Sequence, residues 1–380
     1  MSHFIPQANP KAAYLAHKEQ LLDAVRNVLE SGWYINGEQV RTFEHAFASF
    51  CSASHGIGVG NGTDAIELAL RALGVTRESL VFTVSHTAVA TVSAVERAGA
   101  TPVLVDVEAD HYTMSPASLE AALTAAKAGA YGPGKPAAII PVHIYGQPAD
   151  MDAILAIAAR FGVPVIEDCA QAHGAQYKGR TVGSMGLMGT FSFYPTKNLG
   201  AFGDGGCVVT SDAALSHHMK VLREYGWEER YRSFHAGINT RLDELHAAML
   251  AVRLPHLAAE NEARRNIAAI YRKELAGLPG IILPKEREES RHVYHLFVVQ
   301  VHRRDQFMAQ LREDDIGTSI QYPEPVHMQP AYRGSIHLAP EGLPVTEALC
   351  TRIVSLPLYP ELPEADARRV ATAIRNILAA

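Results

Sequence analysis

The sequence is poor in cysteine, and its few cysteines form no recognisable pattern. The chain has four cysteines among its 380 residues, and Cys51, Cys169, Cys207 and Cys350 are scattered without metal-ligand spacing. We therefore predict a reduced protein that has no metal site.

Long runs of basic or apolar residues are also missing. No lysine- and arginine-rich run occurs and the formal net charge is −6, so we expect neither nucleic acid nor an anionic membrane surface as a partner. No apolar stretch reaches transmembrane length, and residues 1–6 lack the basic and apolar regions of a secretion signal. These absences predict a soluble, cytoplasmic protein.

The chain is rich in hydrophobic residues. Hydrophobic residues make up 48% and charged residues 19% of the sequence, which is enough to bury large cores and predicts two domains. Short apolar, strand-like runs alternate with longer helical stretches, and they lie at residues 80–84, 101–106, 138–142 and 163–166. This alternation predicts an α/β fold with a mostly parallel sheet flanked by helices.

The C-terminal third has a different pattern. Residues 239–275 are mostly helical, although Pro255 should kink or break the helix. Beyond them, residues 292–299 and 352–356 have the composition of strands in a smaller C-terminal α+β domain. We predict a large domain at residues 1–250 and a small domain at residues 251–380.

One lysine has an unusual sequence environment. Residues 190–194, before Lys197, are aromatic and strand-like, and a glycine-rich turn follows at residues 200–206. Glycines allow the backbone to approach a bound group closely, whereas an ordinary surface lysine lies among polar neighbours on a helix. A structural role is the commoner one for a single lysine, but this setting is also typical of a lysine that bonds covalently to a cofactor.

A carboxylate upstream strengthens the second interpretation. The apolar strand at residues 163–166 leads into Asp168, and ligands of open parallel sheets bind outside the carboxyl ends of the strands. Asp168 and Lys197 can therefore meet at one ligand. Pyridoxal phosphate requires this pair, because an amine bonds to its aldehyde and a carboxylate keeps its ring nitrogen protonated. The alternative for Asp168 is an exposed carboxylate that caps a helix.

A possible phosphate site lies nearer the N-terminus. Residues 58–64 form a glycine-rich turn with a Thr-Asp helix start, followed by apolar residues at helical spacing. The free N–H groups of a first helical turn favour an anion. Many helices begin this way and bind nothing, so the segment is informative only together with Asp168 and Lys197.

With these segments in order, the chain resembles the DegT/DnrJ/EryC1/StrS family of pyridoxal-phosphate-dependent nucleotide-sugar aminotransferases. The resemblance covers nearly the whole chain, and further matching segments lie at residues 37–38, 43–44, 85–87, 99–102, 105–107, 143–151 and 237–245. It implies the type I fold of aspartate aminotransferase. The chain departs from the family at residues 77–81, and at His246, where glutamine is usual, but neither departure affects a catalytic position.

The resemblance implies a role for each matched residue. Lys197 and Asp168 would be catalytic, with Lys197 both holding the cofactor and moving protons. The cofactor-binding residues would be Gly62, Thr63, His86, Asp168, Gln171, Ser192, Lys197 and Asn239. Within this set, Gln171 would reach the cofactor's 3-hydroxyl edge and His86 would stack on its ring. Asn239 would reach the phosphate from the neighbouring subunit, which implies a homodimer with shared active sites.

The implied reaction moves an amino group from L-glutamate to a keto-deoxysugar linked to a nucleotide. Residues 194–201 and 321–329 most resemble enzymes that aminate C-3 of dTDP-3-keto-6-deoxyhexoses, and C-4 amination of an NDP-4-keto-6-deoxyhexose is the alternative. Tyr322 and His327 are candidate sugar contacts. Their proline-rich segment is about equally typical of an ordered surface loop.

Other functional classes share this fold. Dehydratases of the group replace the lysine by histidine, which Lys197 argues against. A non-catalytic regulator would tolerate loss of Lys197 or Asp168, and both are present. A cysteine desulfurase would need a reactive thiolate, and none of the four cysteines has obvious stabilising neighbours.

Overall fold

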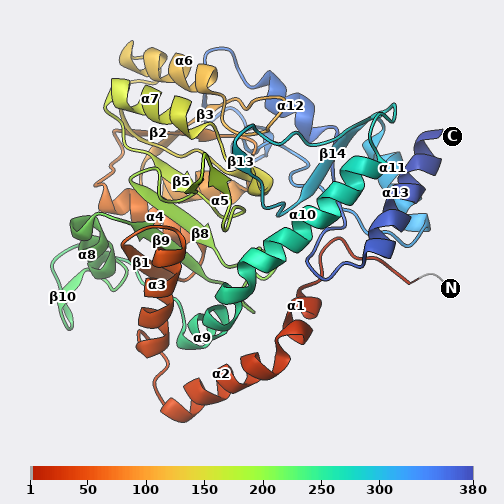
Figure 1. Cartoon of the computed structure of the whole chain (residues 1–380). Coiled ribbons are helices and arrows are strands. Elements are labelled where there is room, and N and C mark those ends of the chain that lie inside the picture. The colour runs from red at the N-terminus through yellow and green to blue at the C-terminus, as the bar shows by residue number, and fades with distance from the viewer. Residues whose placement is uncertain (1–2, 380) are drawn as a thin grey trace.

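The computed structural model describes residues 3–379, and its centre is a twisted, mostly parallel sheet (Figure 1). Parallel bridges from Ile139 to Val165 and from Val142 to Asp168 join two four-stranded halves into the order β1-β9-β8-β5-β4-β2-β3-β15. Strand β9 runs antiparallel to both of its neighbours. The strands are β1 (His55–Val59), β9 (Gly206–Thr210), β8 (Met188–Ser192), β5 (Ile166–Asp168), β4 (Lys135–Ile139), β2 (Ser79–Val84), β3 (Thr101–Val105) and β15 (His337–Leu338).

Helices cover both faces of this sheet, as the continuous apolar strands predicted (Figure 1). Successive residues of a strand point to opposite faces, so Phe82 packs in the core shared with α6 and α7 while Val81 packs in the core shared with α4 and α5. The helices of this region are α3 (Glu38–Phe50), α4 (Gly62–Ala72), α5 (Val89–Arg97), α6 (Pro116–Lys127), α7 (Met151–Phe161) and α8 (Ala213–Leu222). The predicted α/β architecture is confirmed.

The predicted helical stretch is interrupted at the expected position. Helix α9 (Glu244–Arg253) is followed by a 3-10 turn, Leu254–His256, and then by α10 (Leu257–Glu274). Pro255 has no N–H to donate, so the α-helical hydrogen-bond ladder is broken there. In Figure 1 the long helix α10 runs from the base of the main sheet towards the C-terminal elements.

The C-terminal elements build a second sheet with antiparallel order β12-β14-β16. Its core includes residues of α10, α11 and α13. The strand expected at residues 292–299 begins later, because the Val293 N–H binds the Gly146 carbonyl instead of a sheet neighbour. The elements are β12 (Ile281–Ile282), β14 (Phe297–Val301), α11 (Arg304–Glu313), β16 (Ile353–Leu356) and α13 (Glu364–Ala379). The division at residue 250 stays a prediction.

Several shorter elements surround these two layers. They are α1 (Pro10–Ala16), α2 (Lys18–Ser31), β6 (Gln176–Tyr177), β7 (Arg180–Thr181), β10 (Trp227–Glu229), β11 (Arg232–Ser233), β13 (Ser290–Arg291), α12 (Pro344–Cys350) and the 3-10 turns Ile144–Gly146 and Val326–Met328. Among the helices within residues 3–379, none combines the length and the apolar character that crossing a membrane requires.

Candidate active site

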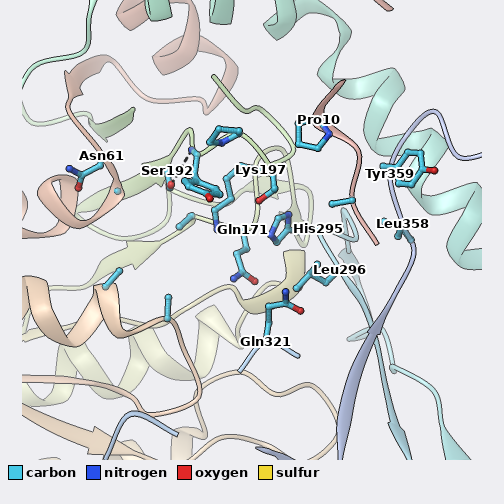
Figure 2. Close-up of a pocket in the computed structure, with 18 of the residues that line it drawn as sticks. Pro10, Asn61, Gln171, Ser192, Lys197, His295, Leu296, Gln321, Leu358 and Tyr359 are labelled. Carbon is cyan, nitrogen blue, oxygen red and sulfur yellow. Dashed lines mark hydrogen bonds between the residues drawn. The ribbon is translucent and has the colours of Figure 1, made fainter. Parts of the chain in front are cut away.

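A cavity of about 550 Å³ opens beside the carboxyl ends of β5 and β8, within the size range of small-molecule sites (Figure 2). Most of the residues predicted from the sequence line it, although they come from distant parts of the chain. These residues are Gly62, Thr63, Asp168, Gln171, Ser192, Lys197 and Tyr322. The fold therefore brings the predicted amine, carboxylate and helix start to one cavity.

Lys197 lies in a firmly anchored loop between β8 and β9. Its N–H binds the Tyr194 carbonyl at 2.8 Å. The side-chain Nδ2 of the next residue, Asn198, donates to Asn261 Oδ1 at 2.8 Å and to the Val293 carbonyl at 3.1 Å. Figure 2 shows the Lys197 side chain between Ser192 and His295, extended towards Gln171. The lysine is thus presented to the cavity by a loop that is tied to α10 and to the C-terminal segment.

The enclosed position changes the protonation of this lysine. Burial lowers the pKa of Lys197 to about 8, and the nearby Asp168 carboxylate opposes that shift only in part. A nucleophilic lysine must be neutral, so near neutral pH a much larger fraction of Lys197 is reactive than of an ordinary lysine.

This pKa gives a testable pH dependence. Below pH 8 the neutral fraction of Lys197 rises about tenfold per pH unit, and above pH 8 it levels off. We expect the rate at which the apoprotein captures pyridoxal phosphate, followed by absorbance, to rise and level off in the same way. A rate that keeps rising to about pH 10.4, the value of an unperturbed lysine, would contradict the assignment.

Asp168 ends β5 and is almost fully buried. Its Oδ2 accepts a hydrogen bond from Thr91 Oγ1 at 2.9 Å, and its Oδ1 accepts one from the Ala170 N–H at 3.1 Å. Thr91 is in turn 2.9 Å from Thr87 Oγ1. Burial raises the pKa of Asp168, while the two donors favour the charged form. The carboxylate is therefore fixed in direction on the cavity wall, and it is not an exposed helix cap.

The neighbouring Glu167 points to the opposite side of β5 and has a structural role. Its oxygens accept hydrogen bonds from His143 Nε2 at 3.0 Å and from the N–H groups of Gly183, Met185 and Gly186. His143, Glu167 and Cys169 are close enough together to suggest a metal site. We assign none, because the histidine and the glutamate are already hydrogen-bonded and burial raises the pKa of the Cys169 thiol.

The start of α4 is suited to an anion. Asn61 Oδ1 caps the helix by accepting a hydrogen bond from the Asp64 N–H at 2.9 Å. Within residues 3–379, the N–H groups of Gly62 and Thr63 donate to no backbone carbonyl. A Cβ atom on Gly62 would lie 2.7 Å from Ser192 Cβ, so only glycine lets this turn approach the serine so closely. An anion bound at this end of the cavity would therefore meet two free N–H groups, the positive end of the helix dipole and the Ser192 hydroxyl.

Gln171 and Tyr322 also line the cavity, and they are hydrogen-bonded to each other. Gln171 Oε1 accepts from the Tyr145 N–H at 2.7 Å, and its Nε2 donates to Tyr322 Oη at 3.2 Å. Burial raises the pKa of Tyr322 to about 12, so its hydroxyl keeps its proton at neutral pH. Both side chains are held at the edge of the cavity where they can donate to a ligand.

Three predicted contacts lie elsewhere. His86 is buried and 2.8 Å from Tyr145 Oη, and Thr87 and Ala88 line the cavity in its place. His327 binds Ser85 Oγ at 2.8 Å and Glu347 at 3.2 Å, outside the cavity lining. Asn239 is exposed and also lies outside the lining. We therefore do not assign direct ligand contacts in this subunit to His86 or His327.

The sequence interpretation missed several residues of the site. Thr91 is one of them, and it lies 77 positions from the carboxylate that it binds. His295 and Arg264 also line the cavity. The sequence could have indicated Arg264, because this arginine lies on the apolar face of α10 together with the buried residues Leu257, Asn261 and Ile267.

A buried lysine with a lowered pKa, a buried carboxylate and a helix start suited to an anion line one cavity of a mostly parallel sheet, and this arrangement indicates a pyridoxal-phosphate-dependent enzyme. More particularly, the chain belongs to the DegT/DnrJ/EryC1/StrS aminotransferase family, whose profile matches residues 16–375. Pyridoxal phosphate is the cofactor of this family. The residues present fit it, since the cavity wall carries an amine with a lowered pKa, a buried carboxylate and a helix start suited to a phosphate.

Several similar relatives are named as transaminases, and the similarity extends over nearly their full length. The chain is 44% identical over 373 residues to dTDP-3-amino-3,4,6-trideoxy-alpha-D-glucose transaminase from Streptomyces venezuelae, covering 98% of this chain and 96% of the relative. It is 42% identical over 374 residues to UDP-N-acetyl-3-dehydro-alpha-D-glucosamine 3-aminotransferase from Acidithiobacillus ferrooxidans, covering 98% of each. The crystal structure of S. venezuelae DesV with a ketimine intermediate matches at a TM-score of 0.94 and 43% identity, covering 100% of both chains.

Proposed function

We propose that this protein transfers the amino group of L-glutamate to C-3 of a dTDP-3-keto-6-deoxyhexose. The observation that carries the proposal is the convergence of Lys197 and Asp168 on one cavity with the α4 start. The sugar part is supported by the named substrates of the relatives. Because one of those relatives is named for a UDP sugar, the nucleotide is the less strongly supported part.

The bound cofactor would supply an electrophilic aldehyde and a conjugated ring that withdraws electrons from the reacting carbon. Lys197 Nζ would attach the cofactor. Once released, this amine would accept a proton from the reacting carbon of the amino donor, and in the second half of the reaction it would donate a proton to the sugar carbon that receives the amine. The lowered pKa of Lys197 suits both tasks, because the amine accepts and releases a proton near neutral pH.

The remaining residues would hold the cofactor in place. Asp168, oriented by Thr91, would keep a proton on the ring nitrogen, and this interaction is strong because the carboxylate is buried. Gly62, Thr63 and Ser192 would bind the phosphate. Gln171 and Tyr322 would orient the ring edge and the incoming sugar by hydrogen bonds.

The direct test is to assay the protein with L-glutamate and either 3-keto or 4-keto dTDP-deoxysugars, and to locate the new amine by NMR. Amination at C-3 is expected. Amination at C-4 would support the alternative, and no amination of any keto sugar would remove the sugar half of the proposal.

Other classes on this fold are less well supported. Lys197 argues against a dehydratase that uses histidine at this position, and a regulator would not need the preserved Lys197–Asp168 pair. A desulfurase would need a thiolate, yet all four cysteines are buried and burial raises the pKa of each. We expect iodoacetamide to leave turnover intact.

We further propose a cytoplasmic homodimer with shared active sites. Large apolar side chains lie exposed on α2 and the loop that follows it, including Leu22, Leu29 and Trp33, and Tyr194 is exposed beside the cavity lysine. Such surfaces are typical of protein interfaces. Asn239 is exposed, and in such a dimer it would bind the cofactor's phosphate in the neighbouring subunit.

Subunit mixing tests the shared site. A Lys197→Ala subunit and an Asn239→Ala subunit should each have low activity alone. A hybrid dimer would have one site with both residues intact, so random mixing should restore about a quarter of wild-type activity. Mixtures that stay as inactive as their components would contradict a shared site, and the same samples measured by light scattering give the oligomeric state.

A further inference from the structure

Arg264 is a buried cation with no ionic partner. It lies on α10, is 6% exposed and lines the cavity. Its Nη1 donates only to the carbonyls of Leu358, at 3.2 Å, and Tyr294, at 3.5 Å, while its Nε is buried without a partner. Within residues 3–379 no carboxylate oxygen forms an ion pair with this guanidinium. Burying an unpaired charge is costly, so the arginine is suited to an anion that arrives from outside.

The charged groups near Arg264 do not provide an ion-pair partner for its guanidinium. Arg253 lines the same wall but is paired with Glu260 at 3.0 Å and donates to the Gly200 carbonyl at 2.7 Å. Glu260 also binds His17 at 3.1 Å. Burial lowers the pKa of His295 well below its usual value, which leaves that ring neutral. Glu260 and Glu361 act on Arg264 electrostatically, but neither carboxylate forms an ion pair with its guanidinium.

Glu361 is a second acidic group near Arg264. It lines the cavity, and its Oε2 is buried without a hydrogen-bond partner. Burial raises the pKa of Glu361, and the charges of Arg264 and Arg253 oppose that shift.

The position of Arg264 indicates which anion it receives. Lys197 and Arg264 line the same cavity, and both lie beside the segment of His295. The His295 ring is 3.2 Å from Oδ1 of Asn198, the residue after Lys197, and Arg264 donates to the carbonyl of Tyr294, the residue before His295. An α-amino acid carries its carboxylate on the carbon that bears the amine. An amine placed at the reacting end of Lys197 therefore keeps its carboxylate within the same enclosed space.

We propose that Arg264 binds the α-carboxylate of the amino-acid donor. This inference rests on the proposed aminotransferase function and adds the residue that recognises the donor. A guanidinium forms paired, charge-assisted hydrogen bonds with a carboxylate, which both strengthens binding and fixes the direction of the Cα–N bond. A single enclosed guanidinium fits a carboxylate better than a nucleotide diphosphate, which would require several donors.

The first test compares the Arg264→Gln and wild-type holoenzymes. The glutamate concentration that half-saturates conversion of the bound cofactor, followed by absorbance, should rise about 10- to 100-fold in the variant. Binding of glutarate, which lacks the amine, should weaken similarly in calorimetry, while the dissociation constant of pyridoxal phosphate should change less than about 2-fold. Arg287→Gln removes a largely buried arginine, with 11% of its side chain exposed, that is paired with Glu108 and Asp150, and it serves as the matched control.

Unchanged glutamate and glutarate binding in Arg264→Gln would overturn the inference. So would an equal loss of cofactor affinity, because that would assign Arg264 to the cofactor or to the fold.

A second test uses the unaltered enzyme and therefore does not depend on the variant folding. L-Glutamate, its α-amide and its γ-amide are compared as donors. The α-amide should react at least about 10-fold more weakly than the γ-amide, because it lacks the charge that Arg264 recognises. Equal reaction of the two amides would overturn the inference alone. If no amino acid converts the bound cofactor, the proposed function itself fails.

Discussion

The Lys197→Ala protein is expected to lose transamination by a factor of about 10⁴ or more. Two functions disappear with the amine, namely covalent attachment of the cofactor and proton transfer at the substrate carbon. No neighbouring lysine can replace it, since Lys197 is the sole lysine lining the cavity within residues 3–379. Absorbance spectra of the protein mixed with pyridoxal phosphate, together with turnover by an amine-detecting assay, measure both functions.

A matched control separates this loss from a general effect of removing a lysine. Lys220 is exposed on α8 and does not line the cavity, so Lys220→Ala should keep wild-type turnover. Added methylamine should restore part of the activity of Lys197→Ala, because a small amine can enter the vacated space. Near-normal turnover in Lys197→Ala would contradict the role assigned to the lysine.

The Asp168→Asn protein is expected to lose about 10²- to 10³-fold of its activity while keeping or gaining stability. Asparagine has nearly the same shape but cannot hold a proton on the ring nitrogen by its charge. Folding raises the pKa of Asp168, so the folded state binds its proton more tightly than the unfolded state, and the charged form costs stability as pH rises through that pKa. At neutral pH the apoprotein should therefore melt no lower with asparagine.

This opposite movement of activity and stability distinguishes a functional carboxylate from a structural one. The midpoint of thermal unfolding of the apoprotein and turnover of the holoprotein are measured on the same preparations. Asp152, an exposed residue that binds Lys178 and Arg180, supplies the control Asp152→Asn, which should leave turnover unchanged. A lower melting temperature together with normal turnover in Asp168→Asn would contradict the account.

The parts of the fold that follow from local pattern were predictable from the sequence. The apolar runs that became β2, β3 and β4 are continuous because both faces of the sheet are covered, and Pro255 interrupts its helix for a purely local reason. The strand expected from residue 292 starts at Phe297, because the residues before it bind a distant turn around Gly146. Local pattern carries no information about such a partner.

The residues of the site also divide into those that local sequence pattern predicts and those that depend on distant contacts. Asp168 and Lys197 follow strands of one sheet, so the rule that ligands bind at strand ends was enough to bring them together. Thr91 and Arg264 reach the cavity from helices, where their role depends on the rotation and packing of the helix. The positions of His86 and His327, outside the lining, are set by hydrogen bonds to Tyr145 and Ser85 that only the folded chain creates.

The most direct measurement of the central claim is to reduce the holoprotein with borohydride and locate the modified residue by peptide mass spectrometry. Reduction converts the bond between the cofactor's aldehyde carbon and a lysine nitrogen into a stable amine. The added mass of the pyridoxyl phosphate group is expected on the peptide containing Lys197. Its appearance on another lysine, or on none, would contradict the proposed active site.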